Sequence, residues 1–345
     1  MNPVTKKTES NHIHPSYDEF KKNRPIWTTS LRRGIEYLLF RFGLFFGGKL
    51  SLSKLQNFGR RLGKIAYIIL QKDRGIIERQ LKLVYPEQDS STRDSWTREC
   101  FEHFGQMLFE FLSLPQILKE EASLLKIQNE EVLKKAVQAK KGVILLAMHS
   151  GNWELISAYA KRSGIKMNAT TANFPDQRIN MLIEKQRGHE NMEILRRGTS
   201  KATKRIIQCL KNKEVLVLAI DQDTNVLSTW IPFFGIPAKT PVGAAQFALK
   251  TGATVVSYIA IRQNDGTFIM RFESLGIFLR KHKTLEQDLF STLRIMNQHI
   301  EDRIREHPSQ WAWFHRRWRH RPSENDLKKM NKLEKKYQQT SSSKK

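Results

Sequence analysis

Acidic residues and cysteines are scarce in this chain of 345 residues. It has 34 Asp and Glu against 59 Lys and Arg, which gives a formal net charge of +25 at neutral pH. The two cysteines, Cys100 and Cys209, each stand alone, with no second cysteine or histidine at the spacing of a metal site. Neither a disulfide scaffold nor a structural zinc site is therefore expected, and two free thiols are typical of a reducing compartment.

Long apolar runs are also missing. No run reaches the ~18 consecutive apolar residues of a membrane-spanning helix, and residues 1–25 are polar, without the apolar core of a secretory signal. Residues 31–70 are rich in aromatic and aliphatic side chains, but Glu36, Arg41 and Lys49 interrupt them. This mixture indicates a helix that lies in the membrane interface. A helix packed on the domain's own core and a tilted single span are the alternatives.

The positive charge is concentrated in two segments. Residues 21–82 contain 15 Lys and Arg against 3 Asp and Glu, and residues 315–345 contain 11 against 3. Such segments bind anionic membranes, acidic carrier proteins and nucleic acids alike, so charge does not choose among these partners. Residues 310–318 mix tryptophans with basic side chains, a composition found at membrane interfaces and in nucleic-acid grooves. No helix-turn-helix, RNP-type strand or finger motif in the sequence supports nucleic-acid binding.

The order of the predicted elements indicates an α/β fold. Strands are predicted at 142–148, 214–220, 253–261 and 267–273, with Gly266 joining the last two. Helices are predicted at 152–162, 176–189, 200–212, 241–250 and 286–306, and Thr240-Pro241 is interpreted as the N-cap and first residue of the fourth. Alternation of this kind predicts a mainly parallel central sheet flanked by helices, with an antiparallel edge.

One catalytic domain with appendages accounts for the length of the chain. We expect the following parts: a flexible leader at 1–30, a membrane-associated helical segment at 31–72, the catalytic domain at 73–322, and a basic, disordered tail at 323–345.

One stretch, Gly142 to Glu154, carries the clearest chemical signal. Its first seven residues are uncharged and mostly apolar, which predicts a buried strand, and a polar turn at 149–152 leads from it into a helix. The turn should lie at the carboxyl end of a strand, where open α/β sheets keep their reactive groups. We expect the Glu154 carboxylate to contact one nitrogen of the His149 ring, fix its tautomer and raise the basicity of the other nitrogen. A surface histidine beside a glutamate favoured at a helix start is the alternative.

The segment His149-Ser-Gly-Asn-Trp-Glu154 resembles the His-x4-Asp/Glu motif of glycerolipid-type acyltransferases. With its glutamate, it is similar to the lipid A late acyltransferases of Gram-negative bacteria. Three later stretches resemble the same family in the same order: Asp221–Asp223, Pro232–Thr240 and Gln310–Trp318. The resemblance covers about residues 35–322. It implies direct transfer of a fatty acyl group from acyl carrier protein to a lipid hydroxyl, without a cofactor or metal.

The resemblance also implies roles for single residues. His149 would be the general base and Glu154 would orient it. Arg187, about thirty residues beyond Glu154, lies nearest the position of an active-site arginine in the family. The backbone N–H groups of Gly151 and Asn152, at the helix start, are candidate donors to the thioester oxyanion.

Two pairs of residues near the same predicted sheet edge are candidates for substrate binding. Asp221 and Asp223 follow a strand, so we expect them to hold sugar hydroxyls or to brace the loop; capping of the strand end is the alternative. A lone Asp-x-Asp does not predict a metal site. Phe233 and Phe234 are expected to wall a groove for an acyl chain, because each buried CH2 contributes about 0.8 kcal/mol. Ordinary core packing would have the same composition.

These features predict an enzyme at the cytoplasmic face of the bacterial inner membrane, either peripheral or single-pass, that acylates a lipid A precursor. Its expected partners are acyl carrier protein, the anionic membrane and the lipid acceptor, and no nucleic acid is expected. One alternative is acylation of another glycolipid or phospholipid. A second is a non-enzymatic basic protein that binds membranes or nucleic acid, which would have no need for His149 with Glu154.

Overall fold

A computed structural model describes residues 26–172, 174–197 and 200–342. The leader predicted at 1–30 therefore lies almost entirely outside the described residues. The chain divides into two compact units, Met1–Phe42 and Gly43–Lys345, and the boundary falls within helix α2 (Ile26–Gly47). In the described part of the chain, no helix combines the length and the apolar character needed to cross a membrane.

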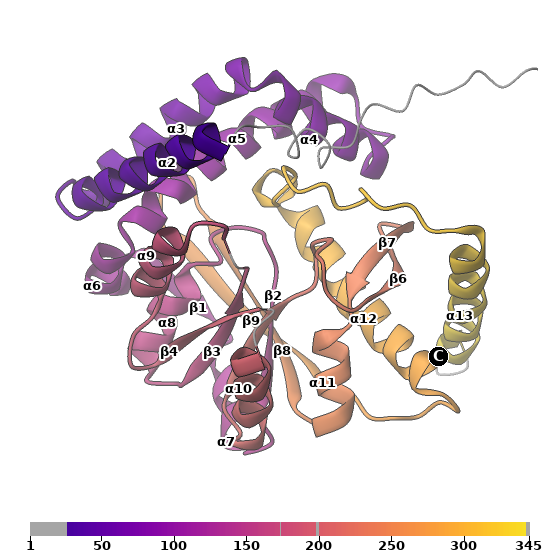
Figure 1. Ribbon diagram of the computed structural model, residues 1–345. Coiled ribbons are helices and arrows are strands. Elements are labelled where there is room, and N and C mark those ends of the chain that lie inside the picture. The colour runs from indigo at the N-terminus through magenta and orange to yellow at the C-terminus, as the bar shows by residue number, and fades with distance from the viewer. Residues whose placement is uncertain (1–25, 173, 198–199, 343–345) are drawn as a thin grey trace, which may run out of the picture. The chain divides into compact units, whose positions relative to one another are not determined.

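The larger unit is built on a sheet of seven strands in the order β1-β9-β8-β2-β5-β3-β4 (Figure 1). Strands β8 and β9 pair antiparallel, whereas the pairs that involve β1 to β5 are parallel. The strands are β1 (Leu125–Gln128), β2 (Val143–Ala147), β3 (Met167–Thr171), β4 (Met192–Arg196), β5 (Val215–Ala219), β8 (Thr254–Arg262) and β9 (Phe268–Ile277). The predicted fold class, a mainly parallel sheet with an antiparallel edge, is confirmed.

Strand prediction succeeded where the strand is strongly apolar. Strands β2, β5, β8 and β9 lie where they were predicted, whereas β1, β3 and β4 gave no usable signal because they are short and partly polar, as in Met167-Asn-Ala-Thr-Thr. A hairpin of β6 (Ser228–Phe233) and β7 (Ile236–Pro241) also replaces the predicted loop and helix start. Thr240 is not an N-cap: its hydroxyl is buried and donates to the carbonyl oxygen of Ala238.

Helices cover both faces of the sheet, because alternate residues of the central strands point to opposite sides. Ile144 and Leu146 of β2 belong to one core cluster, and Val143 and Leu145 belong to the other. The helices of the larger unit are α3 (Leu52–Ile69), α4 (Gln71–Val84), α5 (Ser90–Leu112), α6 (Leu114–Leu124), α7 (Glu130–Gln138), α8 (Leu155–Ser163), α9 (Gln177–Arg187), α10 (Ser200–Lys211), α11 (Gly243–Thr251), α12 (Leu285–Glu306), η1 (Pro308–Gln310) and α13 (Glu324–Ser342). Helices α7 and α8 pack on one face, and α11 and α12 on the other.

Helix α3, within the predicted membrane-associated segment, has two different faces. One face packs on α5 through small residues: a Cβ added at Gly59 or Gly63 would overlap the backbone of α5. A second face presents Ile65, Ile68 and Ile69 to solvent, each at least half exposed. The helix is therefore part of the folded unit through one side and leaves an apolar side uncovered in the structure.

The C-terminal part of the chain differs from its sequence-based interpretation. Trp311, Trp313 and Arg317 are completely buried, so these residues of the segment 310–318 belong to the core and not to a membrane or nucleic-acid surface. The guanidinium of Arg317 donates to the carbonyl oxygen of Lys239 at 2.6 Å and stacks over the Phe233 ring. Beyond it, residues 324–342 form helix α13 instead of a disordered tail. Leu327, Met330, Leu333 and Tyr337 share one side of this helix and pack on the core.

Candidate active site

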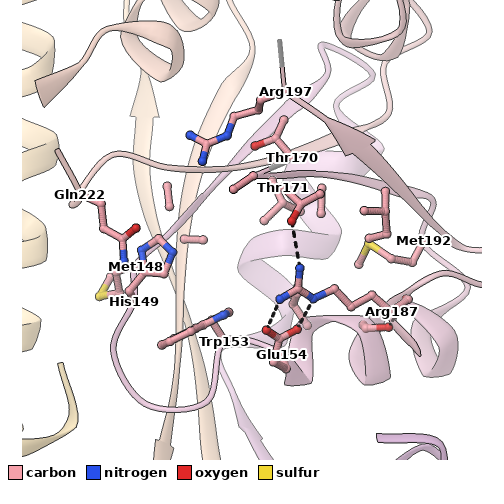
Figure 2. A pocket seen from close by; sticks show the side chains of 18 of the residues that line it. Met148, His149, Trp153, Glu154, Thr170, Thr171, Arg187, Met192, Arg197 and Gln222 are labelled. Carbon is pink, nitrogen blue, oxygen red and sulfur yellow. Dashed lines mark hydrogen bonds and ion pairs between the residues drawn. The ribbon is translucent and has the colours of Figure 1, made fainter. Parts of the chain in front are cut away.

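A cavity of about 250 Å³ lies where β2, β3 and β5 end (Figure 2). These strands are parallel neighbours in the order β2-β5-β3, so their carboxyl ends meet at one edge of the sheet. His149 and Glu154 line the cavity from the segment after β2, and Gln222 lines it from the segment after β5. Arg187 lines it from the end of α9. As the sequence predicts, His149 lies just beyond the carboxyl end of a buried strand, β2.

His149 is held by a buried aspartate. Its ring nitrogen Nδ1 lies 2.8 Å from Asp221 Oδ1, and its backbone N–H donates to Asp221 Oδ2 at 2.7 Å. The indole N–H of Trp311 donates to the same Oδ2 at 2.9 Å. Burial alone would raise the pKa of Asp221, but the charge of His149 and the hydrogen bonds from His149 and Trp311 lower that pKa to about 2. An ionised Asp221 makes Nδ1 the donor and leaves Nε2 as the basic nitrogen.

Nε2 of His149 is the ring nitrogen available to a ligand. Within the described residues it has no hydrogen-bonding partner, and the His149 side chain is 26% exposed at the cavity. The Trp153 ring packs against the imidazole edge to face at 4.9 Å between centroids. The imidazole is thus fixed by Asp221 and Trp153 with its basic nitrogen free.

The sequence predicted that Glu154 contacts the imidazole of His149, but in the structure both of its carboxylate oxygens are bonded to Arg187. Nε of Arg187 donates to Oε2 at 2.6 Å and Nη2 donates to Oε1 at 2.5 Å, and Figure 2 shows these two hydrogen bonds side by side. The same guanidinium donates to Thr171 Oγ1 at 3.1 Å and lies over the ring of Phe111. Burial would lower the pKa of Arg187, but the charge and hydrogen bonds of Glu154 raise it. The pair therefore forms a rigid, charged wall of the cavity.

The turn that carries His149 is fixed by its own backbone. Gly151 has φ of +62°, and a side chain there would overlap the carbonyl group of Ala260. The N–H of Gly151 donates to the carbonyl oxygen of Gln310 at 2.9 Å, and that of Asn152 donates to the carbonyl oxygen of Ala260 at 2.8 Å. These two N–H groups were the predicted oxyanion donors. Because both are already bonded to carbonyl groups, they brace the turn instead of facing the cavity.

A buried polar network lies behind the turn. Asn152 Nδ2 donates to Glu110 Oε2 at 2.7 Å, and Arg262 Nη2 donates to the same oxygen at 2.7 Å. Gln56 of α3 donates to Glu110 Oε1 at 2.8 Å. His103 Nε2 lies 3.2 Å from the carbonyl oxygen of Gly151. Glu110 is fully buried and thus connects α3, α5, β8 and the turn.

Two histidines near the site make the folded state sensitive to acid. Burial, together with the charge of Arg262, lowers the pKa of His103 to about 3. Burial lowers the pKa of His315 to about 4 despite the nearby charge of Asp221. In the unfolded chain both groups have a pKa near 6.5. Below that pH the unfolded state takes up protons that the folded state does not, so stability falls as pH falls from about 6.5 towards 4.

We expect each of these two histidines to lower the free energy of unfolding of the protein by about 2 kcal/mol when the pH falls from 7 to 5. Urea denaturation of the purified protein at both pH values measures the loss, and the His103→Gln variant should lose less than the wild type. A free energy of unfolding that is equal at the two pH values would show that neither histidine is held neutral.

Three of the predicted substrate-binding residues lie away from the cavity. Asp223 is buried, with Oδ2 2.6 Å from Nδ1 of His320, so it fixes the C-terminal segment. Phe233 is fully buried in the core against Trp311 and Trp318. Phe234 lines a separate depression. The aromatic pair therefore forms no wall of the cavity at His149. Among the described residues, no group of three or more His, Cys, Asp or Glu could hold a metal ion.

Several residues of the site were missed in the sequence. Asp221 was singled out, but as a ligand for the acceptor and not as the partner of His149. Trp311 was noted only as part of the segment 310–318, whose composition is found at membrane interfaces and in nucleic-acid grooves, and Glu110 and Arg262 were not considered. The hydrogen bonds between these residues, and between Glu110 and Asn152 of the turn, join positions that are 42 to 152 residues apart. A useful signal was the isolated Glu110 in the otherwise apolar stretch Met107-Leu-Phe-Glu-Phe-Leu112, because a lone acidic residue on a buried helix face requires a partner.

The chain is similar in sequence to known proteins. Residues 25–320 match the family described as bacterial lipid A biosynthesis acyltransferase. The chain is 26% identical over 315 residues to the lipid A biosynthesis lauroyltransferase of Escherichia coli (strain K12), covering 90% of this chain and 94% of the relative. It is 24% identical over 274 residues to the palmitoleoyltransferase of the same organism, covering 76% and 84%. A phosphatidylinositol mannoside acyltransferase of Mycobacterium tuberculosis (strain CDC 1551 / Oshkosh) is 23% identical over 186 residues, covering 53% and 56%.

The family match and these relatives define the protein as an acyltransferase. The family match extends over most of the chain and includes the turn at 149–152, the stretch Asp221–Asp223 and the buried tryptophans Trp311 and Trp313. The chain belongs to the bacterial lipid A biosynthesis acyltransferase family. The family resemblance seen in the sequence is confirmed.

Proposed function

We propose that the protein transfers a fatty acyl group from acyl carrier protein to a hydroxyl of a lipid A precursor. The observation that carries the proposal is the His149–Asp221 pair, whose free Nε2 faces a cavity with both apolar and charged lining. The two Escherichia coli relatives are named for the transfer of lauroyl and palmitoleoyl groups in lipid A biosynthesis, which supports a fatty acyl donor and this acceptor.

The reaction needs one base and no covalent intermediate. Nε2 of His149 removes the proton from the acceptor hydroxyl while the hydroxyl oxygen attacks the carbonyl carbon of the acyl thioester. The C–S bond then breaks, and the proton on Nε2 passes to the leaving thiolate. Asp221 keeps Nδ1 protonated and stabilises the positive charge that the ring carries between the two proton transfers. The products are the acylated lipid and the free thiol of the carrier.

Arg187 and Glu154 have a supporting role in this scheme. Three N–H directions of the Arg187 guanidinium are occupied by Glu154 and Thr171, and a guanidinium has five N–H groups in all. The remaining donors are available to a substrate oxygen in the cavity. Glu154 acts by holding Arg187 in place, so it is a positioning residue.

An acyl-transfer assay tests the function. The purified protein is supplied with acyl carrier protein loaded with fatty acids of different lengths and with one of two acceptors, a lipid A precursor or phosphatidylinositol mannoside, the latter because of the mycobacterial relative. Mass spectrometry of the lipids should show an added acyl group on the lipid A precursor. Acylation of the mannoside alone would identify phosphatidylinositol mannoside, and not the lipid A precursor, as the acceptor. The absence of any acylated lipid would overturn the proposal.

We further propose that α3 binds the enzyme to an anionic membrane at the cytoplasmic face of the inner membrane. Ile65, Ile68 and Ile69 lie exposed on one side of the helix, and Arg61 and Lys64 lie beside them along the sequence. Apolar side chains of this kind enter the acyl boundary of a bilayer, and each nearby Lys or Arg adds about 1 kcal/mol at an anionic surface.

Replacing Ile65, Ile68 and Ile69 with glutamine should reduce binding to phosphatidylglycerol vesicles at least 10-fold, because the inserted apolar area is lost. These substitutions spare the face that packs on α5, whereas deletion of residues 1–72 would remove it. Vesicle flotation at physiological salt measures the bound fraction. Leu279→Gln, which changes an exposed leucine on another surface, is the control. Equal binding of the triple variant and the wild type would place the membrane contact elsewhere.

A further inference from the structure

Arg197 differs from the neighbouring arginines because, among the described residues, its guanidinium has no acidic partner. Arg187 is paired with Glu154, Arg196 with Glu184, and Arg178 with Asp176. Within the part of the chain that the structure describes, no carboxylate pairs with the Arg197 side chain. Asp221, the remaining carboxylate close to the cavity, is occupied by His149 and Trp311.

The side chain nevertheless lies in the active-site cavity and not in open solvent. Arg197 is half-buried, and its backbone N–H donates to the carbonyl oxygen of Thr171 at 3.0 Å, which fixes it beside the end of β3. Figure 2 shows its guanidinium beside Thr170, across the cavity from the Glu154–Arg187 pair. Burial lowers the pKa of Arg197, and no neighbouring carboxylate offsets this effect. A partly desolvated cation without a partner is costly to keep, so it is expected where a ligand supplies the opposite charge.

Arg197 also stands where two cavities adjoin. The second cavity, of about 170 Å³, shares Thr170, Arg197 and Ala219 with the catalytic one. The rest of its lining is mainly apolar and includes Leu218, Val226 and Phe247. A ligand that places an anionic group on Arg197 therefore has an apolar surface on one side and the His149 ring on the other. An amphiphile with a charged group near its reactive end has this chemistry.

We propose that Arg197 binds a phosphate group of one of the two substrates of acyl transfer and thereby orients that substrate towards His149. This inference rests on the proposed function. Phosphate oxygens accept two parallel hydrogen bonds from a guanidinium, and among the described residues the Arg197 guanidinium has no carboxylate partner that would compete with a phosphate. Two sources carry this chemistry: a phosphate on the glycolipid acceptor and the phosphodiester in the pantetheine arm of the acyl carrier.

Steady-state kinetics of Arg197→Gln, Arg197→Lys and the control Arg196→Gln separate the two sources. The acceptor is a lipid A precursor with its phosphates or the same lipid after phosphatase treatment. The donor is acyl carrier protein or the acyl thioester of N-acetylcysteamine, which lacks a phosphate. For one phosphate-bearing substrate, Arg197→Gln should lower kcat/KM about 10- to 100-fold, mainly through KM, and its phosphate-free counterpart should be unaffected. Arg197→Lys should retain part of the effect, and the control should resemble the wild type.

The phosphate-bearing substrate whose kcat/KM falls in Arg197→Gln identifies the source of the phosphate. An unchanged kcat/KM in Arg197→Gln, or an equal loss with phosphate-bearing and phosphate-free substrates, would overturn the proposal. Calorimetric titration of the wild type and Arg197→Gln with the phosphorylated lipid and with phosphopantetheine is independent of turnover. In one outcome the wild type binds one of these probes and loses that binding in Arg197→Gln, yet transfers no acyl group. That result would support the phosphate site and overturn the proposed function.

Discussion

Replacing His149 with alanine should lower the rate of acyl transfer by roughly 10²- to 10⁴-fold, because the hydroxyl would lose its general base. We expect Asp221→Asn to cause a loss of similar size. Asparagine has no charge to stabilise the imidazolium, and its amide can present either an oxygen or an NH2 group to Nδ1, so the tautomer is no longer fixed. The measurement is kcat with acyl carrier protein as donor, at equal circular dichroism.

Glu154→Gln provides the matched comparison, because the sequence and the structure assign this residue different contacts. Its carboxylate bonds to Arg187, so its replacement should lower activity while the tautomer of His149 stays as in the wild type. NMR spectra of 15N-labelled histidine report which ring nitrogen carries the proton, a property that simple destabilisation would not change. If Glu154→Gln altered the tautomer and Asp221→Asn did not, Glu154 would be the orienting residue after all.

The sequence was informative where the physical signal is local. An apolar run followed by a polar turn and a helix places His149 at the carboxyl end of β2, and the structure has it there. This inference depends only on residues within one strand–turn–helix unit. Arg187, by contrast, was suggested by the family resemblance, and the structure shows that it lines the cavity.

The partner of His149 could not be predicted in this way. Glu154 is five residues away and Asp221 is 72 residues away, so only the pairing of β2 with β5 shows that Asp221 is the nearer carboxylate. Apolar composition was equally ambiguous. Phe233 is buried against tryptophans, although a groove-lining phenylalanine would look the same in the sequence. Arg197 could be recognised only in the structure, where the nearby carboxylates are bonded to other residues: Glu154 to Arg187, Glu184 to Arg196 and Asp221 to His149.

Glu110 should be among the residues that matter most for stability. It accepts hydrogen bonds from Gln56, Asn152 and Arg262, and neither Glu110 nor the Arg262 side chain has appreciable contact with solvent. Removing one partner of a buried ion pair leaves the other charge uncompensated. We therefore expect Glu110→Ala to lower the free energy of unfolding by about 3–5 kcal/mol, as measured by urea denaturation. Activity should fall as well, because Asn152 and the turn of His149 lose their anchor.

A double variant separates the charge from the packing. Glu110→Ala combined with Arg262→Met removes both charges, so it should be more stable than Glu110→Ala alone. Asp302→Ala, which breaks an exposed pair with Arg305, should change the free energy of unfolding by less than about 1 kcal/mol. If Glu110→Ala were as mild as this surface control, the network would not hold the catalytic turn. Since Gln56 links the network to α3, the same variant should also loosen the α3–α5 contact, which hydrogen exchange of the α3 amides would detect.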